Sequence, residues 1–201
     1  MKIIWNGHAC FTLRTEDGSL VLDPYADGKV PGLKPLRLQA DLVLCSHEHA
    51  DHNARECVKL SGKSTHFKIS AIDTWHDDAQ GKLRGPNRIH IIETEKMKVV
   101  HLGDLGCDLT QEEIGQLSGC DVLMIPVGGH YTIDGKQAAE IAKGLSARVI
   151  LPMHFRSGNI GYDVISTADD FLRYQTNIVT YPGAEIEITA ATPAQTAVLK
   201  I

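Results

Sequence analysis

One short segment places four potential metal ligands directly after a predicted buried strand. The run Asp41-Leu-Val-Leu-Cys45 is apolar and typical of a strand that is buried on both faces. It leads straight into Ser46-His-Glu-His-Ala-Asp-His52. Imidazole and carboxylate groups suit zinc and related ions, and they are costly to bury without partners. The segment therefore predicts a metal site at the carboxyl end of a strand, in preference to a solvated polar loop.

The spacing within this segment indicates two ions. His47 and His49 are two residues apart, so they can point to one side as they do on a strand. Asp51 and His52 would begin a helical turn and could face a second ion. These four ligands do not complete two sites, so other parts of the chain must contribute. Ligand-type residues follow predicted strands at four further positions, namely Asp23, His76, Asp104 and His154.

The rest of the chain predicts hairpins followed by β/α alternation, repeated loosely in each half. Predicted strands cover residues 2–5, 10–14, 20–22, 41–45, 68–72, 88–93, 98–101, 122–125, 148–151, 178–180 and 185–188. Predicted helices cover residues 53–60, 111–117 and 135–145, with Thr110 and Asp134 as N-caps of the last two. Residues 24–38 are expected to form an irregular loop. This order predicts two mixed sheets with helices outside, in one domain that spans residues 1–201.

Composition excludes several classes of protein. The chain has 201 residues, of which 43% are hydrophobic and 22% are charged, as in an ordinary globular domain. The net charge is −5 and no block of like charge is present, so we expect no nucleic-acid partner and no membrane surface. No apolar stretch approaches the roughly 20 residues that cross a bilayer. Five cysteines without a CxxC pair, and no visible secretory signal, predict a cytoplasmic protein with reduced thiols.

Six motifs occur along the chain in a fixed order: LDP, SHEHADH, WHDD, HLGDLG, IPVGG and LPMH. The series resembles the metallo-β-lactamase superfamily, and more narrowly its compact branch of metal-dependent hydrolases similar to ascorbate-phosphate lactonases. The resemblance runs from Trp5 to about Phe155. It implies an α+β fold, a four-layer αβ/βα sandwich with the metals in a cleft at one edge.

The resemblance also implies a ligand set. The first ion would be held by His47, His49 and His76, the second by Asp51, His52 and His154, with Asp104 bridging both. Three protein ligands per ion leave the open position that a catalytic site needs. Asp23 matches the first motif, whose carboxylate supports the ligand histidines without binding metal. The implied cofactor is a pair of divalent ions, zinc first, with manganese or iron as alternatives.

Three further residues have two interpretations each. His8 resembles a position near the cleft and either supports the site or packs within its turn. His130 follows two glycines in a loop that could overhang the cleft, where the ring would protonate a leaving group; the alternative is an exposed loop histidine. Arg156 lies two residues after His154 and binds either an anionic group of the substrate or a surface acid.

The predicted function is metal-assisted hydrolysis of a small ester, lactone or phosphodiester, with Asp104 and His130 as catalytic residues. The expected partner is therefore a small-molecule substrate, and the oligomeric state is not predicted. One alternative is an iron-dependent redox enzyme of the dioxygenase type on the same scaffold. A flavin-linked di-iron reductase is disfavoured by His49 and by the lack of a flavin domain. The other alternative is a metal-binding protein without catalytic activity.

Overall fold

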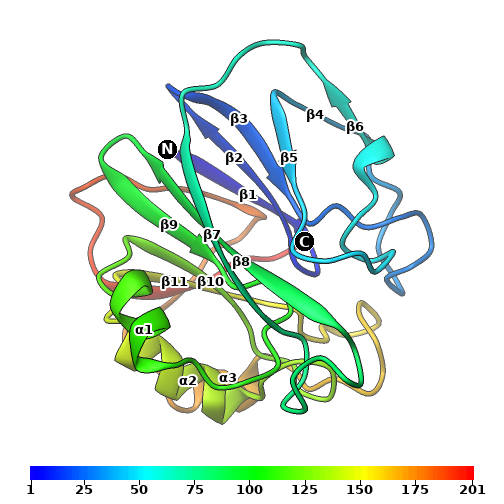
Figure 1. Ribbon diagram of the computed structural model, residues 1–201, viewed down its shortest axis with the longest axis vertical. Helices are drawn as coiled ribbons and strands as arrows, with labels where there is room; N and C mark the ends of the chain where they lie inside the picture. Colours follow the sequence, from blue (N-terminus) through cyan, green and yellow to red (C-terminus); the bar gives the residue numbers. More distant parts are fainter.

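Two mixed β-sheets face each other in the computed structural model, which describes residues 1–201 (Figure 1). The smaller sheet has the order β13-β1-β2-β3-β5, with bounds Glu185–Glu187, Lys2–Gly7, Cys10–Thr15, Gly18–Leu22 and Leu42–Leu44. The larger sheet has the order β12-β14-β11-β10-β9-β8-β7, with bounds Ile178–Thr180, Gln195–Val198, Val149–Met153, Val122–Pro126, Met97–His101, Pro86–Thr94 and Lys68–Trp75. A separate parallel pair consists of β4 (Leu38–Ala40) and β6 (Val58–Leu60).

The main core lies between the two sheets and extends to the helices. It is a cluster of 37 buried residues drawn from both sheets. Side chains alternate between the two faces of the smaller sheet along β3. Leu20 and Leu22 belong to this cluster, while Val21 lies on the opposite face. Each fully buried leucine contributes roughly 1.5–3 kcal/mol, so this core dominates the stability of the sandwich.

Three helices cover the side of the larger sheet that is turned away from the smaller one (Figure 1). They are α1 (Gln111–Leu117), α2 (Gly135–Gly144) and α3 (Asp169–Leu172). Thr110 and Asp134 cap α1 and α2, each within a capping box, as predicted. No helix is long and apolar enough to cross a membrane. The arrangement confirms the predicted α+β sandwich of two mixed sheets.

The outer face of the smaller sheet is covered by irregular chain. Eight buried residues form a second apolar cluster there, in which Val21 and Val43 meet Tyr25, Val30 and Leu36 of the loop. The predicted helix over residues 53–60 is wrong: a single 3₁₀ turn, Arg55–Cys57, is followed by β6. Only Val58 of β6 is buried, so the segment lacks the apolar stripe that would dock a helix on the sheet. The short elements β4, α3 and β14 were not predicted.

Strand direction brings the candidate ligands to one edge of the sandwich. In the smaller sheet, β1 and β3 are both antiparallel to β2, and β5 is parallel to β3. In the larger sheet, β9, β10 and β11 are parallel, and β7 shares their direction because both β7 and β9 are antiparallel to β8. The residues that follow the carboxyl ends of these strands include His8, Asp23, Ser46, His76, Asp104 and His154.

We predict that the irregular layer on the smaller sheet is an integral part of the fold. Leu36 is 6% exposed within that layer, so Leu36→Ala should lower the free energy of unfolding by about 2–3 kcal/mol. Leu60→Ala is the matched control, because Leu60 is 58% exposed, and it should change stability by less than about 0.5 kcal/mol. Urea denaturation measures both values. Equal effects would show that the layer contributes nothing to the core.

Candidate metal centre

Two groups of imidazole and carboxylate side chains lie at the shared edge of the sheets. One group is His47, His49 and His76; the other is His8, Asp51, His52 and His154. Within each group the potential ligand atoms all lie within 4.8 Å of one another, which is close enough for a single ion to reach them. His49 is exposed, whereas the other histidines of both groups are buried. The first group is therefore open on the His49 side.

Asp104 lies between the two groups. Its Oδ2 atom is 3.3 Å from Nε2 of His76 in the first group. The same oxygen is 3.2 Å from Nε2 of His52 and 3.1 Å from Nε2 of His154 in the second group. Burial alone would raise the pKa of the Asp104 carboxyl, but His154 and His52 outweigh it and hold the pKa well below its usual range. A single ionised oxygen thus contacts both groups.

The turn before Asp104 requires glycine. Gly103 has a φ of +57°, and a Cβ atom there would collide with the side chains of Ser46 and Asn87. The backbone N–H of Asp104 donates to Oδ1 of Asn87 at 2.9 Å, and the Asn87 amide donates to Thr74 and to the carbonyl of Leu102. Asn87 therefore fixes the backbone that presents the central carboxylate.

Asp23 orients a histidine in each group. Its carboxylate accepts from the Ser46 backbone N–H at 2.6 Å, from the Ser46 hydroxyl at 2.5 Å and from Nδ1 of His52 at 2.9 Å. Because an ionised carboxylate only accepts, Nδ1 of His52 carries a proton, and Nε2, which faces Asp104, is the nitrogen that would bind a metal ion. The Ser46 hydroxyl gives its proton to Asp23, so it accepts from Nδ1 of His47 at 2.9 Å. Nε2 of His47 is left free in the same way.

Burial keeps two of these histidines neutral. Burial and the nearby His52 lower the pKa of His47 to about 3. Burial and the neighbouring His154 lower the pKa of His8 to about 4. Metal binding requires neutral imidazole, so both rings are in the competent form at neutral pH.

Three strand ends adopt the left-handed backbone region that side chains rarely occupy. The φ angles are +55° at His8, +44° at Asp23 and +53° at His154. Such residues cost of order 1 kcal/mol each and persist where surrounding contacts determine them. Here the His154 N–H donates to the His8 carbonyl, which also accepts from the Trp5 indole. All three side chains lie at the centre: His8 and His154 belong to the second group, and Asp23 bonds His52.

A cavity of about 270 Å³ opens onto both groups. Apart from ligand-type residues it is lined by Leu83, Arg84, Tyr131 and Tyr162. The Tyr162 hydroxyl lies 3.1 Å from Oδ2 of Asp51 and 2.8 Å from the carbonyl oxygen of Lys29, so its single proton can be donated to either acceptor. Nε2 of His8 is 3.3 Å from the same Asp51 oxygen. The cavity can hold a small molecule against both ligand groups.

Comparison with known proteins agrees with this geometry. A family profile described as a beta-lactamase superfamily domain matches residues 2–154. The chain belongs to the metallo-β-lactamase superfamily. Within the superfamily, proteins of Thermoplasma acidophilum and Thermoplasma volcanium are named metal-dependent hydrolases. They are 31% and 30% identical to the chain, over 78% and 87% of its length and 84% and 90% of their own.

A solved structure from Thermotoga maritima gives the same result for the fold. That protein, described as a Zn-dependent hydrolase of the metallo-β-lactamase superfamily, is 34% identical to the chain. The match covers 98% of this chain and 97% of that one, with a TM-score of 0.80. The family and fold predicted from the six motifs are therefore confirmed, and the predicted hydrolase activity agrees with the names of these superfamily relatives.

The structure of this superfamily member brings all seven predicted ligands to one place. Six of the seven lie in the two groups, and Asp104 contacts both groups. His8 joins the second group, so it faces the site and does not merely pack within its turn. His101 lies behind the centre, where it bonds the Ala9 carbonyl and the Gly103 N–H. His90 is buried and contacts the Cys45 carbonyl.

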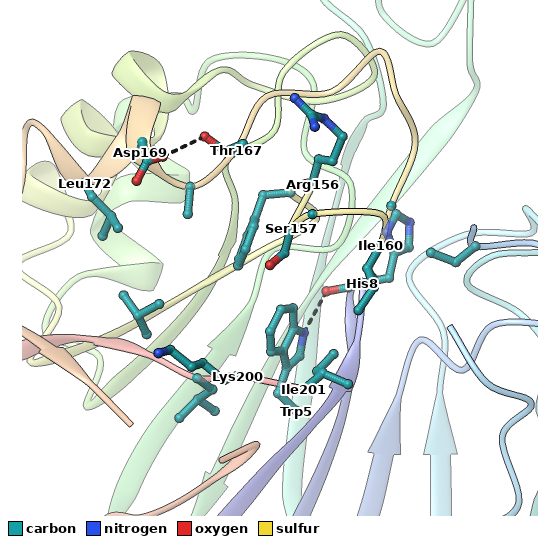
Figure 2. A pocket seen from close by; sticks show the side chains of 17 residues that line it. Trp5, His8, Arg156, Ser157, Ile160, Thr167, Asp169, Leu172, Lys200 and Ile201 are labelled. Carbon is teal, nitrogen blue, oxygen red and sulfur yellow. Dashed lines mark hydrogen bonds between the residues drawn. The ribbon is translucent and has the colours of Figure 1, made fainter. Parts of the chain in front are cut away.

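Two predicted site residues lie elsewhere. The His130 ring is exposed and packs edge-on against Tyr131, and only Tyr131 lines the cavity. His130 also has a left-handed backbone, with a φ of +60°. Arg156 lines a different cavity, of about 410 Å³, which is bounded by His8, Trp5 and Phe155 (Figure 2). Arg156 is not among the residues that line the cavity at the ligand groups.

Several residues of the centre were missed by the sequence analysis. Ser46 and Asn87 hold ligands through hydrogen bonds, and Arg84, Tyr131 and Tyr162 line the cavity. Ser46 stands inside the ligand-rich segment, and Arg84 and Asn87 stand in the segment Arg84-Gly-Pro-Asn87 after His76. Nothing in the sequence distinguishes Tyr162 from a surface tyrosine, because its role depends on a contact with Asp51 that spans 111 residues.

We predict that Asp23→Asn weakens metal binding without removing a ligand. An amide cannot hold the tautomers of His52 and His47 as the carboxylate does, so the affinity for zinc should fall about 10- to 100-fold. Competition with a chromogenic chelator measures the dissociation constant. Asp27→Asn is the control, because Asp27 is exposed and pairs only with Arg37. Unchanged affinity in a folded Asp23→Asn protein would contradict the role assigned to Asp23.

Proposed function

We propose that the protein is a hydrolase that uses two divalent metal ions, zinc first, to cleave a small ester, lactone or phosphodiester. The observation that carries this proposal is the position of Asp104, whose Oδ2 lies within 3.3 Å of imidazole nitrogens from both ligand groups. A carboxylate in that position can bridge two ions. The first ion would be held by His47, His49 and His76, the second by Asp51, His52 and His154.

The donor atoms fit such a pair of ions. Nε2 of His47, Nε2 of His52 and Oδ1 of Asp104 are buried and make no hydrogen bond. Buried polar atoms are rarely left in this state, and each would gain a partner from a metal ion. Nitrogen and carboxylate donors suit zinc, and they also accept manganese or iron. A pair of such ions polarises a carbonyl or phosphoryl oxygen and lowers the pKa of a water molecule held between them.

The chain's own residues supply orientation and enclosure. Asp23 and Ser46 hold the tautomers of His52 and His47, which keeps their Nε2 atoms directed at the centre. His8 and the Tyr162 hydroxyl both contact Oδ2 of Asp51 and limit how that carboxylate can turn. The cavity of about 270 Å³ suits a small substrate.

We also propose that residues 1–201 act as one domain in the cytoplasm. In support of one domain, the main core includes residues from Ile3 to Leu199, so both halves of the chain contribute to it. In support of the compartment, all five cysteines carry free thiols, as in a reducing environment. A small-molecule substrate fits the cavity of about 270 Å³, and no nucleic-acid substrate is proposed.

Elemental analysis of untagged protein tests the metal assignment. We expect about two zinc ions per chain after reconstitution. Asp104→Asn should lower the metal content and reduce kcat more than about 100-fold on whichever ester, lactone or phosphodiester the protein cleaves. Asp108→Asn is the matched control, because Asp108 is exposed four residues further along the same loop. Full metal content and activity in Asp104→Asn would refute the bridging role, and one iron per chain would indicate redox chemistry instead.

A further inference from the structure

We propose that Arg84 binds an anionic group of the substrate, so that the molecule cleaved carries a carboxylate or phosphate beside the bond that is broken. This inference rests on the proposed hydrolase function and specifies its substrate class. Arg84 is the only arginine or lysine that lines the cavity at the ligand groups. It also lines an adjacent cavity of about 330 Å³, and His47 and His49 line that cavity too. Its guanidinium therefore stands where a substrate would pass.

Arg84 lacks an acidic partner within the protein. Its side chain makes one hydrogen bond, from Nη2 to the carbonyl of His130 at 3.0 Å, and its Cζ lies 5.6 Å from the centroid of the Tyr131 ring. A guanidinium has five N–H donors, so most of its hydrogen-bonding capacity is unused. Four other arginines, by contrast, pair with aspartates: Arg37, Arg88, Arg148 and Arg173.

The loop that carries Arg84 is held in place by a buried carboxylate. Asp77 is 2% exposed and accepts hydrogen bonds from four backbone N–H groups, those of Ala79, Gly81, Leu83 and Arg84, at 2.7–3.1 Å. The Gly85 carbonyl accepts from the N–H of the ligand His76 at 3.1 Å. The backbone at Arg84 is thus fixed relative to the centre, which limits the conformational entropy lost when its side chain binds an anion.

The N–H groups of Arg84 that have no partner in the protein suit a planar or tetrahedral anion. Arginine binds carboxylate and phosphate through two parallel hydrogen bonds, and its stacking on Tyr131 leaves the edge of the guanidinium available. Tyr131 also lies near Tyr162, with ring centroids 5.7 Å apart, so aromatic rings flank the space beside Arg84. An anionic group held there would leave the rest of a small substrate facing Asp104.

A structural role for Arg84 is the competing explanation, because its bond to His130 ties two loops together. The two roles differ in what Arg84→Gln should change. A tie between loops would alter stability or metal content and would affect all ligands equally. An anion-binding role would affect anionic ligands only. Lys82→Gln is the matched control, since Lys82 is exposed on the same loop and lines neither cavity.

Calorimetric titration of the zinc-loaded protein with glutarate and with inorganic phosphate tests the inference. We expect Arg84→Gln to raise the dissociation constant about 10- to 100-fold, and Lys82→Gln to change it less than about twofold. The anion with the larger loss identifies carboxylate or phosphate as the preferred group. Equal affinity in wild type and Arg84→Gln, no binding to wild type, or loss of metal in Arg84→Gln would each overturn the inference.

A pair of matched esters separates this inference from the proposed function. Mono-p-nitrophenyl glutarate carries a remote carboxylate and p-nitrophenyl butyrate does not. Arg84→Gln should raise KM for the first by about tenfold or more and leave KM for the second within about twofold. If wild type binds two metal ions and cleaves both esters, but the variant affects them equally, only the role of Arg84 fails. If wild type binds no metal, the proposed function itself fails.

Discussion

The buried carboxylate of Asp23 is the contact on which the rest of the centre depends. It is completely excluded from solvent, and it joins the end of β3 to the segment that follows β5. Burial favours its protonated form, but His101 and His52 outweigh that effect and hold the pKa of Asp23 well below its usual range. The carboxylate in turn sets the proton positions of His52 and, through Ser46, of His47. The histidines therefore stabilise the negative charge of Asp23, and Asp23 in turn fixes the orientation of His52 and His47.

The candidate metal ligands and the residues that would contact a substrate come from different parts of the fold. The ligand groups follow strands that are anchored in the main core, and left-handed residues such as His8 and His154 turn the side chains inward. The residues that would meet a substrate, including Arg84, Tyr131 and Tyr162, come from loops. Precise metal geometry is best supported by strands, whereas loops can change with little effect on the core.

Local sequence information was sufficient to find the side chains that form the two groups, but not the contacts around them. The segment from His47 to His52 contains four candidate ligands within six residues, and each further candidate comes after a predicted strand. His130 has a left-handed backbone that its sequence does not reveal, and its ring is exposed whereas Tyr131 lines the cavity. Arg156 follows His154, whose left-handed backbone the sequence does not reveal either, and it lines the cavity of about 410 Å³. Asn87 and Tyr162 act through contacts between distant segments, which one sequence does not reveal.

The convergence of two sheets on one edge also links metal supply to folding. The unfolded chain has no preformed site, because His52 and His154 are about half the chain apart in sequence. An ion bound between them would act as a reversible cross-link between the two halves of the sandwich. At a free concentration 100 times its dissociation constant, one such ion adds about 2.7 kcal/mol to stability. The lifetime of the folded protein in a cell would then follow the availability of metal there.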